Sequence, residues 1–444
     1  MFKFFQAISL MLLIGCAAAT EPNNSNLSLN TQQRDLKKTL NHQSGGGFIS
    51  AEAKQLLEFC VELNNQDDRL TSDNKDFKAD NGDWTIVYDS RHPGNTEWNK
   101  KWPYTGPISD KINPNNPQNN GFKPFNNAWL LLQSKNKSEY AIAIRGTVKG
   151  LNSIAADALL STIPAKSGLK NQEGKTLPIT FAQTENAELH IGFAYAAFTI
   201  LFDKEHGILS QLQKLNIKPT KLFITGHSQG AAIATLVYSF LYYAITDPND
   251  RYQLNLKLYQ GNYEGVQLKS YIFAQPKPGN LQYSQDLARI SQDLFFTVNN
   301  SLDPVQQIPI TFQLPFEVIN SVSNENLGKG NQVDEMTFNA LYKFSNLFKV
   351  TREEISGLLA KQVEKHYNEQ KLDLNLEQYF PSSQLTNTQP SEKANSQNYT
   401  LAGQLIPVFG LYNGGDLYPG NENTDILLQH HATSYRKLIE NQIP

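Results

Sequence analysis

Two kinds of apolar segment alternate through the middle of the chain. Short segments rich in β-branched and aromatic residues predict buried strands, and they lie at 128–133, 140–147, 221–225, 270–276 and 293–300. Longer segments with an apolar helical pattern predict helices, and they lie at 191–215, 229–245 and 281–290. The first of these helices is expected to be interrupted near Gly207. Strands that alternate with helices in this way predict an α/β fold, in which a mostly parallel central sheet has helices on both faces.

The N-terminal region is organised differently. Residues 1–15 hold one lysine and then an apolar run, which is typical of a secretory signal peptide and too short for a membrane-spanning helix. The polar residues that follow, up to position 46, are expected to form a flexible tether. The amphipathic segment 51–63 predicts a helix, in which Cys60 is expected to be a buried core thiol rather than a reactive one.

One cysteine lies at the end of the signal-like run. The sequence Leu-Ile-Gly-Cys at 13–16 resembles the bacterial lipobox, in which the cysteine is acylated and begins the mature protein. The resemblance implies a lipidated N-terminus over 16–46 and attachment to a membrane through Cys16. The expected location is then the bacterial cell envelope, at the outer membrane. Cleavage after the alanines at 17–19 is the alternative, and it would give a secreted protein.

Composition narrows the classes of partner and site. The 444 residues are enough for a large core, and a net charge of −3 gives no electrostatic reason to expect a nucleic-acid partner. Because there are 2 cysteines, one of them in the lipobox, disulfides are not expected to stabilise the fold. No cysteine–histidine spacing predicts a metal site. The sequence leaves the oligomeric state open.

The segment 223–236, Phe-Ile-Thr-Gly-His-Ser-Gln-Gly-Ala-Ala-Ile-Ala-Thr-Leu, carries the first candidate for chemistry. Ser228 stands between Gly226 and Gly230, where a predicted strand meets a predicted helix. A serine in a tight turn is the plain alternative, but a nucleophile elbow needs this strand–turn–helix setting to project its hydroxyl out of the sheet. The two glycines let strand and helix approach closely, and the helix N-terminus favours developing negative charge. This setting favours Ser228 as a nucleophile.

Four motifs give the sequence from about residue 125 onward a resemblance to the class 3 lipase family. They occur in the family's order and lie at 141–147, 189–196, 224–234, and 273–280 together with 297–309. The elbow departs from the usual family sequence at Gln229, where leucine is usual, and at Ala231, where glycine is usual. The resemblance implies an α/β-hydrolase fold over 47–444 with a lid at 148–189. The segment at about 311–400 is longer than such a fold needs and is expected to be an insertion.

The resemblance also implies roles for single residues. In class 3 lipases the hydroxyl residue after Arg-Gly forms part of the oxyanion hole, so Thr147 inherits this role, together with the main-chain amide of Gln229. Asp303 matches the family's acid. An α/β-hydrolase arranges serine, acid and histidine in this order along the chain, and Asp303 follows Ser228 in a loop after a predicted strand. The alternative for Asp303 is a turn-forming Asp-Pro.

Other aspartates and histidines have plainer interpretations. Asp286 and Asp293 fall within or beside a helical pattern and are expected to be solvated. His366 lies in a charged helical segment and is expected at the surface, and His190 and His227 are expected to pack or hydrogen-bond around the elbow.

The general base is therefore sought among the last histidines of the chain. His430 and His431 are adjacent, and on a helix they would point about 100° apart, so one of them can face Ser228. Family members often carry the histidine five positions before a tyrosine, and Tyr435 lies five positions after His430. This spacing favours His430, with His431 as the alternative base.

The expected reaction is hydrolysis of a carboxylic ester through an acyl-enzyme, with a triacylglycerol or phospholipid as substrate and without a cofactor or metal. Residues 153–163 are expected to form a short apolar lid helix, and an ordinary packed helix is the alternative. An esterase, thioesterase or acyltransferase with the same triad is a second functional hypothesis. A non-catalytic, lipid-binding relative is a third. The sequence leaves head group, acyl length and regioselectivity open.

Overall fold

The computed structural model describes eleven stretches of the chain. They are residues 47–64, 76–77, 84–90, 127–146, 162–170, 176–203, 206–215, 218–259, 264–309, 399–425 and 427–443. Several predictions fall outside these stretches: the signal peptide, the tether and Cys16, Thr147, His366, the first part of the lid helix at 153–161, and the segment 311–398.

A central sheet of eight strands has the order β1-β2-β3-β4-β9-β10-β12-β14. Its strands are β1 (Asp76–Phe77), β2 (Trp84–Asp89), β3 (Trp129–Ser134), β4 (Glu139–Ile144), β9 (Lys221–His227), β10 (Gln267–Phe273), β12 (Phe295–Asn300) and β14 (Gln404–Val408). The five strands from β4 to β14 are parallel, and the strands from β1 to β4 pair antiparallel. The predicted α/β fold with a mostly parallel sheet is confirmed.

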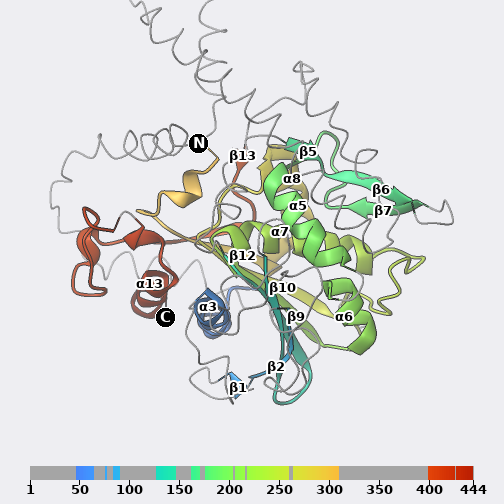
Figure 1. Cartoon of the computed structure of the whole chain (residues 1–444), viewed down its shortest axis with the longest axis horizontal. Helices are drawn as coiled ribbons and strands as arrows, with labels where there is room; N and C mark the ends of the chain where they lie inside the picture. Colours follow the sequence, from blue (N-terminus) through green and yellow to red (C-terminus); the bar gives the residue numbers. More distant parts are fainter. Residues whose placement is uncertain are drawn as a thin grey trace, which may run out of the picture.

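Helices cover both faces of this sheet (Figure 1). One face carries α5 (Ile191–Phe202), α6 (Ile208–Leu215), α7 (Gln229–Ile245) and α8 (Leu281–Ser291). The other face carries α3 (Ser50–Asn64) and the C-terminal α13 (Ala432–Gln442). The predicted interruption near Gly207 is confirmed, because α5 ends at Phe202 and α6 begins at Ile208. There the Asp203 carboxylate accepts the His206 N–H at 2.7 Å.

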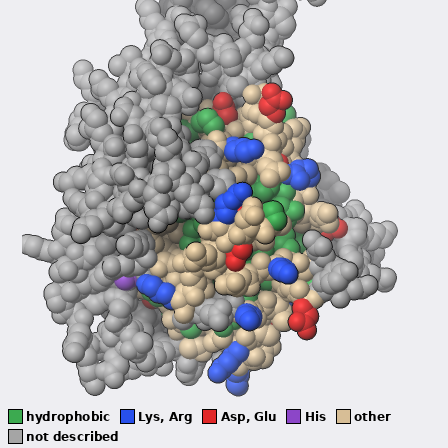
Figure 2. Space-filling view, turned by 90° about the vertical axis from the view of Figure 1, so that its right-hand side faces the viewer, with side chains coloured by type: hydrophobic (Ala, Val, Ile, Leu, Met, Phe, Trp, Pro, Cys, Tyr) green, Lys and Arg blue, Asp and Glu red, His purple; other side chains and the backbone are tan. Residues whose placement is uncertain are grey.

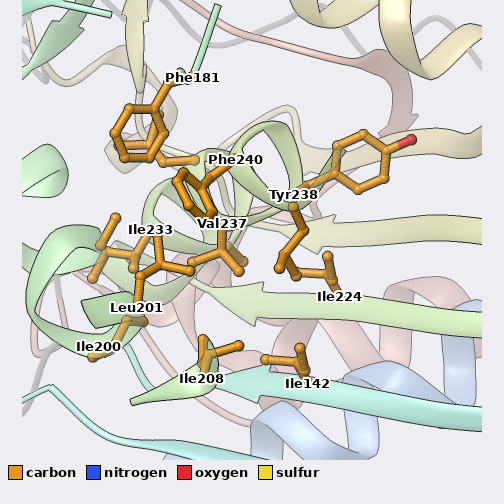
Figure 3. Close-up of a cluster of buried hydrophobic side chains, with 14 of the residues drawn as sticks. Ile142, Phe181, Ile200, Leu201, Ile208, Ile224, Ile233, Val237, Tyr238 and Phe240 are labelled. Carbon is orange, nitrogen blue, oxygen red and sulfur yellow. The ribbon is translucent and has the colours of Figure 1, made fainter. Parts of the chain in front are cut away.

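The larger hydrophobic core lies on the α7 face. Ile142 of β4 and Ile224 of β9 belong to the same buried cluster as Ile233 and Val237 of α7 (Figure 3). Because α5 packs over α7, α7 is buried along most of its length, which explains a sequence that is apolar on nearly every side. Each large apolar side chain buried here contributes about 1.5–3 kcal/mol to folding. The core therefore holds the start of α7 firmly at the end of β9.

The interval predicted to be a lid forms strands where it is described. A four-stranded sheet has the order β13-β11-β8-β5, and a separate hairpin joins β6 and β7. These strands are β5 (Thr162–Pro164), β6 (Lys166–Lys170), β7 (Thr176–Thr180), β8 (Glu188–His190), β11 (Gly279–Asn280) and β13 (Tyr399–Thr400). The last two residues of the predicted lid helix, Thr162 and Ile163, belong to β5 instead. The described residues also include the short 3-10 helices η3 (Gln292–Leu294), η4 (Val305–Gln307), η5 (Tyr412–Gly414) and η6 (Leu428–His430).

Asp286 differs from its prediction. It is buried, and its carboxylate accepts hydrogen bonds from the main chain and hydroxyl of Thr184, at 3.0 and 2.9 Å, and from Tyr243. Arg289, one turn further along α8, forms an ion pair with it at 2.9 Å. The prediction of a solvated side chain was wrong because these partners replace water around the carboxylate. Asp293 is exposed, as predicted.

Cys60 is a core thiol, as predicted. It is buried in α3, and its Sγ lies 3.5 Å from the hydroxyl of Thr225 in β9. Burial raises the pKa of the Cys60 thiol to about 12, so the thiol stays protonated at neutral pH.

The surface of the described residues carries charges of both signs. In the face drawn in Figure 2, basic and acidic side chains are interspersed with small apolar areas. No helix among the described ones combines the length and the apolar composition that crossing a bilayer requires.

A buried ion pair attaches α3 to the sheet. The Nζ of Lys269, whose side chain is 0% exposed, lies 2.7 Å from Glu52 Oε2, and Lys221 Nζ lies 2.8 Å from Glu52 Oε1. Tyr271 donates its hydroxyl to the same carboxylate at 2.7 Å. Burial alone would raise the pKa of Glu52, but the hydrogen bonds from these three side chains outweigh it and lower the pKa. Burial lowers the pKa of Lys269, and Glu52 opposes that shift.

We expect Glu52→Gln to destabilise the fold by about 3–5 kcal/mol at neutral pH, because it removes the carboxylate that forms an ion pair with the buried Lys269 ammonium. Because the pKa of Glu52 is lowered on folding, its contribution is full above the unfolded pKa and is lost as the pH falls through the folded value. Thermal or urea unfolding measures the effect. Glu58→Gln, which removes a partly exposed pair with Arg436, serves as control and should cost about 1 kcal/mol or less. Equal stability of the Glu52 variant and the wild type would contradict the prediction.

Candidate active site

Ser228 stands on a sharp turn between β9 and α7. Its φ is 60° and its ψ is −133°, a combination that residues with a side chain rarely adopt. A Cβ atom on Gly226 would lie 2.2 Å from the carbonyl oxygen of Gly230, and one on Gly230 would lie 2.3 Å from the carbonyl oxygen of Ile144. Both glycines are therefore required by close approach of the main chain, as the sequence suggested.

Three predicted side chains meet at the ends of β9 and β12. The Oγ of Ser228 lies 2.7 Å from Nε2 of His430, and Nδ1 of His430 lies 2.9 Å from Oδ2 of Asp303. The side chain of Asp303 is 0% exposed and that of His430 is 10% exposed, so the histidine retains some contact with solvent that the acid lacks. The geometry is that of a hydroxyl, a base and an acid joined in one chain of hydrogen bonds.

Asp303 is held by two further donors. The N–H of Val305 donates to Oδ1 at 2.8 Å, and the hydroxyl of Tyr435 donates to Oδ2 at 2.8 Å. The carboxylate therefore stabilises the turn before η4 and also pairs with His430, so the two interpretations of the Asp-Pro sequence coexist. Burial, and then the charge of Asp303, raise the pKa of Tyr435 well above its ordinary value, which keeps this hydroxyl a donor.

Tyr435→Phe is expected to lower kcat by about tenfold, because a hydrogen bond to a charged group contributes about 1.5–3 kcal/mol and here it orients the acid. The main-chain N–H of Asn300, which donates to the same hydroxyl at 2.9 Å, also loses its acceptor. Steady-state kinetics of ester hydrolysis, with a thermal unfolding curve for each variant, measures the effect. An unchanged kcat would show that the orientation of Asp303 does not depend on Tyr435.

His431 is turned away from Ser228. It is the N-cap residue of α13, and its Nε2 lies 2.7 Å from Asp425 Oδ2 in an exposed pair. His430 ends η6, so the chain changes direction between the two histidines. The structure thus brings His430 to Ser228 and does not bring His431 there.

One of the two candidate oxyanion donors, Gln229, directly follows Ser228. Gln229 is the first residue of α7 and is buried, so its amide belongs to the N-terminal end of the helix, where negative charge is favoured. Thr147 lies outside the described residues. The strand that leads to it is described: Ile144 of β4 pairs with Gly226 of β9, so the end of β4 lies beside the elbow.

Of the two earlier histidines, His227 packs at the elbow beside His430, as predicted, and His190 packs at the start of α5. His190 is the N-cap of α5, where its Nδ1 accepts the Phe193 N–H at 3.3 Å and its ring stacks on Phe193. His227 is buried, and its Nε2 lies 2.8 Å from the main-chain oxygen of His430. Burial, and then the charge of His430, lower the pKa of His227 well below its ordinary value.

Sequence reasoning missed two residues that support the site. Tyr435 served only to mark a spacing, and on a helix a residue five positions after His430 would point about 140° away from it, so a helical pattern gives no signal for its contact with Asp303. Asn300 donates its side-chain amide to the main-chain oxygen of Gln429 at 2.8 Å and so holds the residue before His430. Nothing in the sequence around Asn300 distinguishes it from a loop asparagine.

Among the described residues, no group of three or more His, Cys, Asp or Glu side chains could hold a metal ion.

Comparisons with known proteins point to one family. The sequence model of the family described as Lipase (class 3) matches residues 141–313, a span that contains Ser228 and Asp303 and ends before His430. No curated protein sequence matches the chain.

Similar solved structures include three lipases. M37 lipase has 16% identity over 71% of this chain and 72% of its own, with a TM-score of 0.33. The triacylglyceride lipase of Rhizomucor miehei has 14% identity over 59% of this chain and 74% of its own, with a TM-score of 0.35. Lipase II from Rhizopus niveus has 16% identity over 59% of this chain and 77% of its own, with a TM-score of 0.34.

Proposed function

We propose that this chain is a serine hydrolase that cleaves carboxylic esters of lipids. The premise is the match of residues 141–313 to the family model described as Lipase (class 3). One observation carries the proposal: Oγ of Ser228 lies 2.7 Å from a histidine whose other ring nitrogen lies 2.9 Å from Asp303. A hydroxyl in this setting can lose its proton to the histidine as it attacks a carbonyl carbon.

The mechanism follows from these positions. Ser228 Oγ attacks the ester carbonyl while its proton passes to Nε2 of His430, and Asp303 stabilises the imidazolium that forms. The amides of Gln229 and Thr147, with the Thr147 hydroxyl, are the proposed donors to the oxyanion, each worth about 3–4 kcal/mol in comparable sites. The C–O bond then breaks and the leaving alkoxide takes the proton from Nε2. Water, activated by the same histidine, hydrolyses the acyl-enzyme and restores Ser228.

Lipid esters, of the triacylglycerol or phospholipid kind, are the substrates that we favour. Large apolar side chains are exposed close to the site in sequence: Leu302, 44% exposed, precedes Asp303, and Leu427, 38% exposed, lies three residues before His430. A water-insoluble substrate would cover such side chains. The alternatives are an esterase, thioesterase or acyltransferase that uses the same three residues, and a non-catalytic lipid-binding relative.

A series of esters with rising acyl length, presented both as monomers and in micelles, tests the proposal. We expect the purified wild type to hydrolyse long-chain esters in micelles with a higher kcat/KM than short-chain monomers, and Ser228→Ala to be inactive on all of them. Preference for short soluble esters or for thioesters would support the second alternative. Lack of turnover on every acyl donor would support the third.

We further propose that the protein is exported and anchored in the cell envelope through acylated Cys16. The support is the lipobox-like sequence at 13–16, which follows a signal-like run at 1–15. Metabolic labelling with a palmitate analogue should modify the wild type and should fail with Cys16→Ser. Secretion of an unacylated wild type that begins at Thr20 would contradict this proposal.

A further inference from the structure

His227 and Ser228 are neighbours in the chain, and both contact His430, one at its main chain and the other at its ring. Ser228 Oγ contacts Nε2 of the His430 ring at 2.7 Å, and His227 Nε2 lies 2.8 Å from the main-chain oxygen of His430. A carbonyl oxygen only accepts, so Nε2 of His227 carries a hydrogen and donates it. The two imidazole rings lie with their centroids 4.9 Å apart.

The carbonyl of His430 lies just before a helix and receives no bond from it. The N–H groups of Ser434 and Tyr435, in the first turn of α13, donate to the carbonyl of His431, at 2.9 and 3.1 Å. Among the described residues, the hydrogen bond to the carbonyl of His430 comes from His227. On the other side of the residue, the His430 N–H donates to Leu427 at 2.8 Å. Both main-chain groups of His430 are thereby fixed, and one of them depends on a side chain.

The surroundings of His227 suit a neutral donor. The side chain is buried between His430 and Tyr435, with its ring at 82° to that of Tyr435. Burial and the charge of His430 hold the pKa of His227 well below its ordinary value, so the ring donates a hydrogen without bringing a positive charge near His430. A neutral donor does not oppose the charge that His430 gains when it takes the serine proton.

We propose that His227 is a positioning residue for the base: by holding the main-chain oxygen of His430 it keeps Nε2 of that ring in line with Ser228 Oγ. This inference rests on the proposed function, because it assumes that His430 accepts the serine proton. A displacement of the base by about 1 Å can lower the rate by about 10²-fold. One hydrogen bond thus joins a residue of β9 to the main chain of the base, which lies 203 positions later.

The test compares three substitutions. His227→Gln keeps an N–H donor at a similar reach, His227→Asn has a donor that is too short, and His227→Phe keeps a ring without a donor. We expect kcat to fall by about 10–100-fold for Phe and Asn, with KM within about twofold, and to stay within about fivefold for Gln. The rate of labelling by a fluorophosphonate probe should fall in parallel. His206→Gln, at another buried histidine that bonds Tyr88, is the control and should keep wild-type kcat.

The outcomes separate this inference from the proposed function. Wild type that reacts with the probe, together with Ser228→Ala that does not, upholds the function whatever the His227 variants do. If His227→Phe does not fold, the comparison of Gln with Asn decides. Recovery of kcat in Gln but not in Asn supports the positioning role. Equal kcat in Gln and Asn, or wild-type kcat in folded His227→Phe, overturns it.

Discussion

His430→Ala is expected to lower kcat by about 10³-fold or more, whereas His431→Ala should stay within about tenfold of the wild type. The reason is geometric. His430 lies between Ser228 Oγ at 2.7 Å and Asp303 at 2.9 Å, while His431 pairs with Asp425 on the surface. Kinetics of ester hydrolysis with both purified variants measures the difference, and circular dichroism shows whether each is folded.

The adjacent histidine makes this a matched comparison, since both substitutions remove the same side chain within one short segment. The reverse pattern, with His431→Ala inactive and His430→Ala active, would move the base by one residue and leave the remaining mechanism standing. Full activity of both variants would mean that the base lies elsewhere.

Asp303→Asn is expected to lower kcat by about 10⁴-fold, as when the acid of a serine triad becomes an amide. The carboxylate accepts from His430, Tyr435 and the N–H of Val305, and its two oxygens serve all three. Asparagine offers one oxygen and an amide group that is itself a donor, so at least one of these bonds becomes a donor–donor contact. The variant would favour the wrong tautomer of His430 and would leave its positive charge without a counter-charge.

Asp425→Asn is the control. Asp425 forms a carboxylate–imidazole pair with His431, as Asp303 does with His430. It should keep wild-type kcat, since its pair is exposed and lies apart from Ser228. Wild-type kcat in Asp303→Asn would remove Asp303 from the mechanism. A loss of the same size in both variants would show that the effect is not specific to the site.

The local sequence was sufficient to predict the elements that carry the site. The predicted helix 229–245 has the same bounds as α7. The predicted strand 221–225 stops two residues before the end of β9. Such segments are predictable because burial on one or both sides imposes a pattern on consecutive residues. The role of the glycines beside Ser228 could also be predicted from the sequence, because close approach of the main chain excludes any side chain there.

Polar contacts between distant segments could not be predicted in the same way. Asp286 has the sequence surroundings of a surface aspartate, and only the fold brings Thr184 and Tyr243 to it. Glu52 and Lys269 lie more than two hundred positions apart, and the local sequence around each of them does not indicate that the two form an ion pair. His227 could be expected near the elbow, but its bond to His430 depends on how η6 meets the end of β9. A pattern in consecutive residues reports burial, whereas the partner of a buried polar group is set by packing.

Covalent labelling of Ser228 is the most direct test of whether this serine is an activated nucleophile. A fluorophosphonate probe reacts with a serine that a neighbouring base activates, and it does so without any assumption about the natural substrate. We expect that wild type is labelled on Ser228, that Ser228→Ala is not labelled, and that His430→Ala is labelled far more slowly while His431→Ala is labelled at close to the wild-type rate. Equal labelling of wild type and Ser228→Ala, or no labelling of folded wild type, would contradict this expectation.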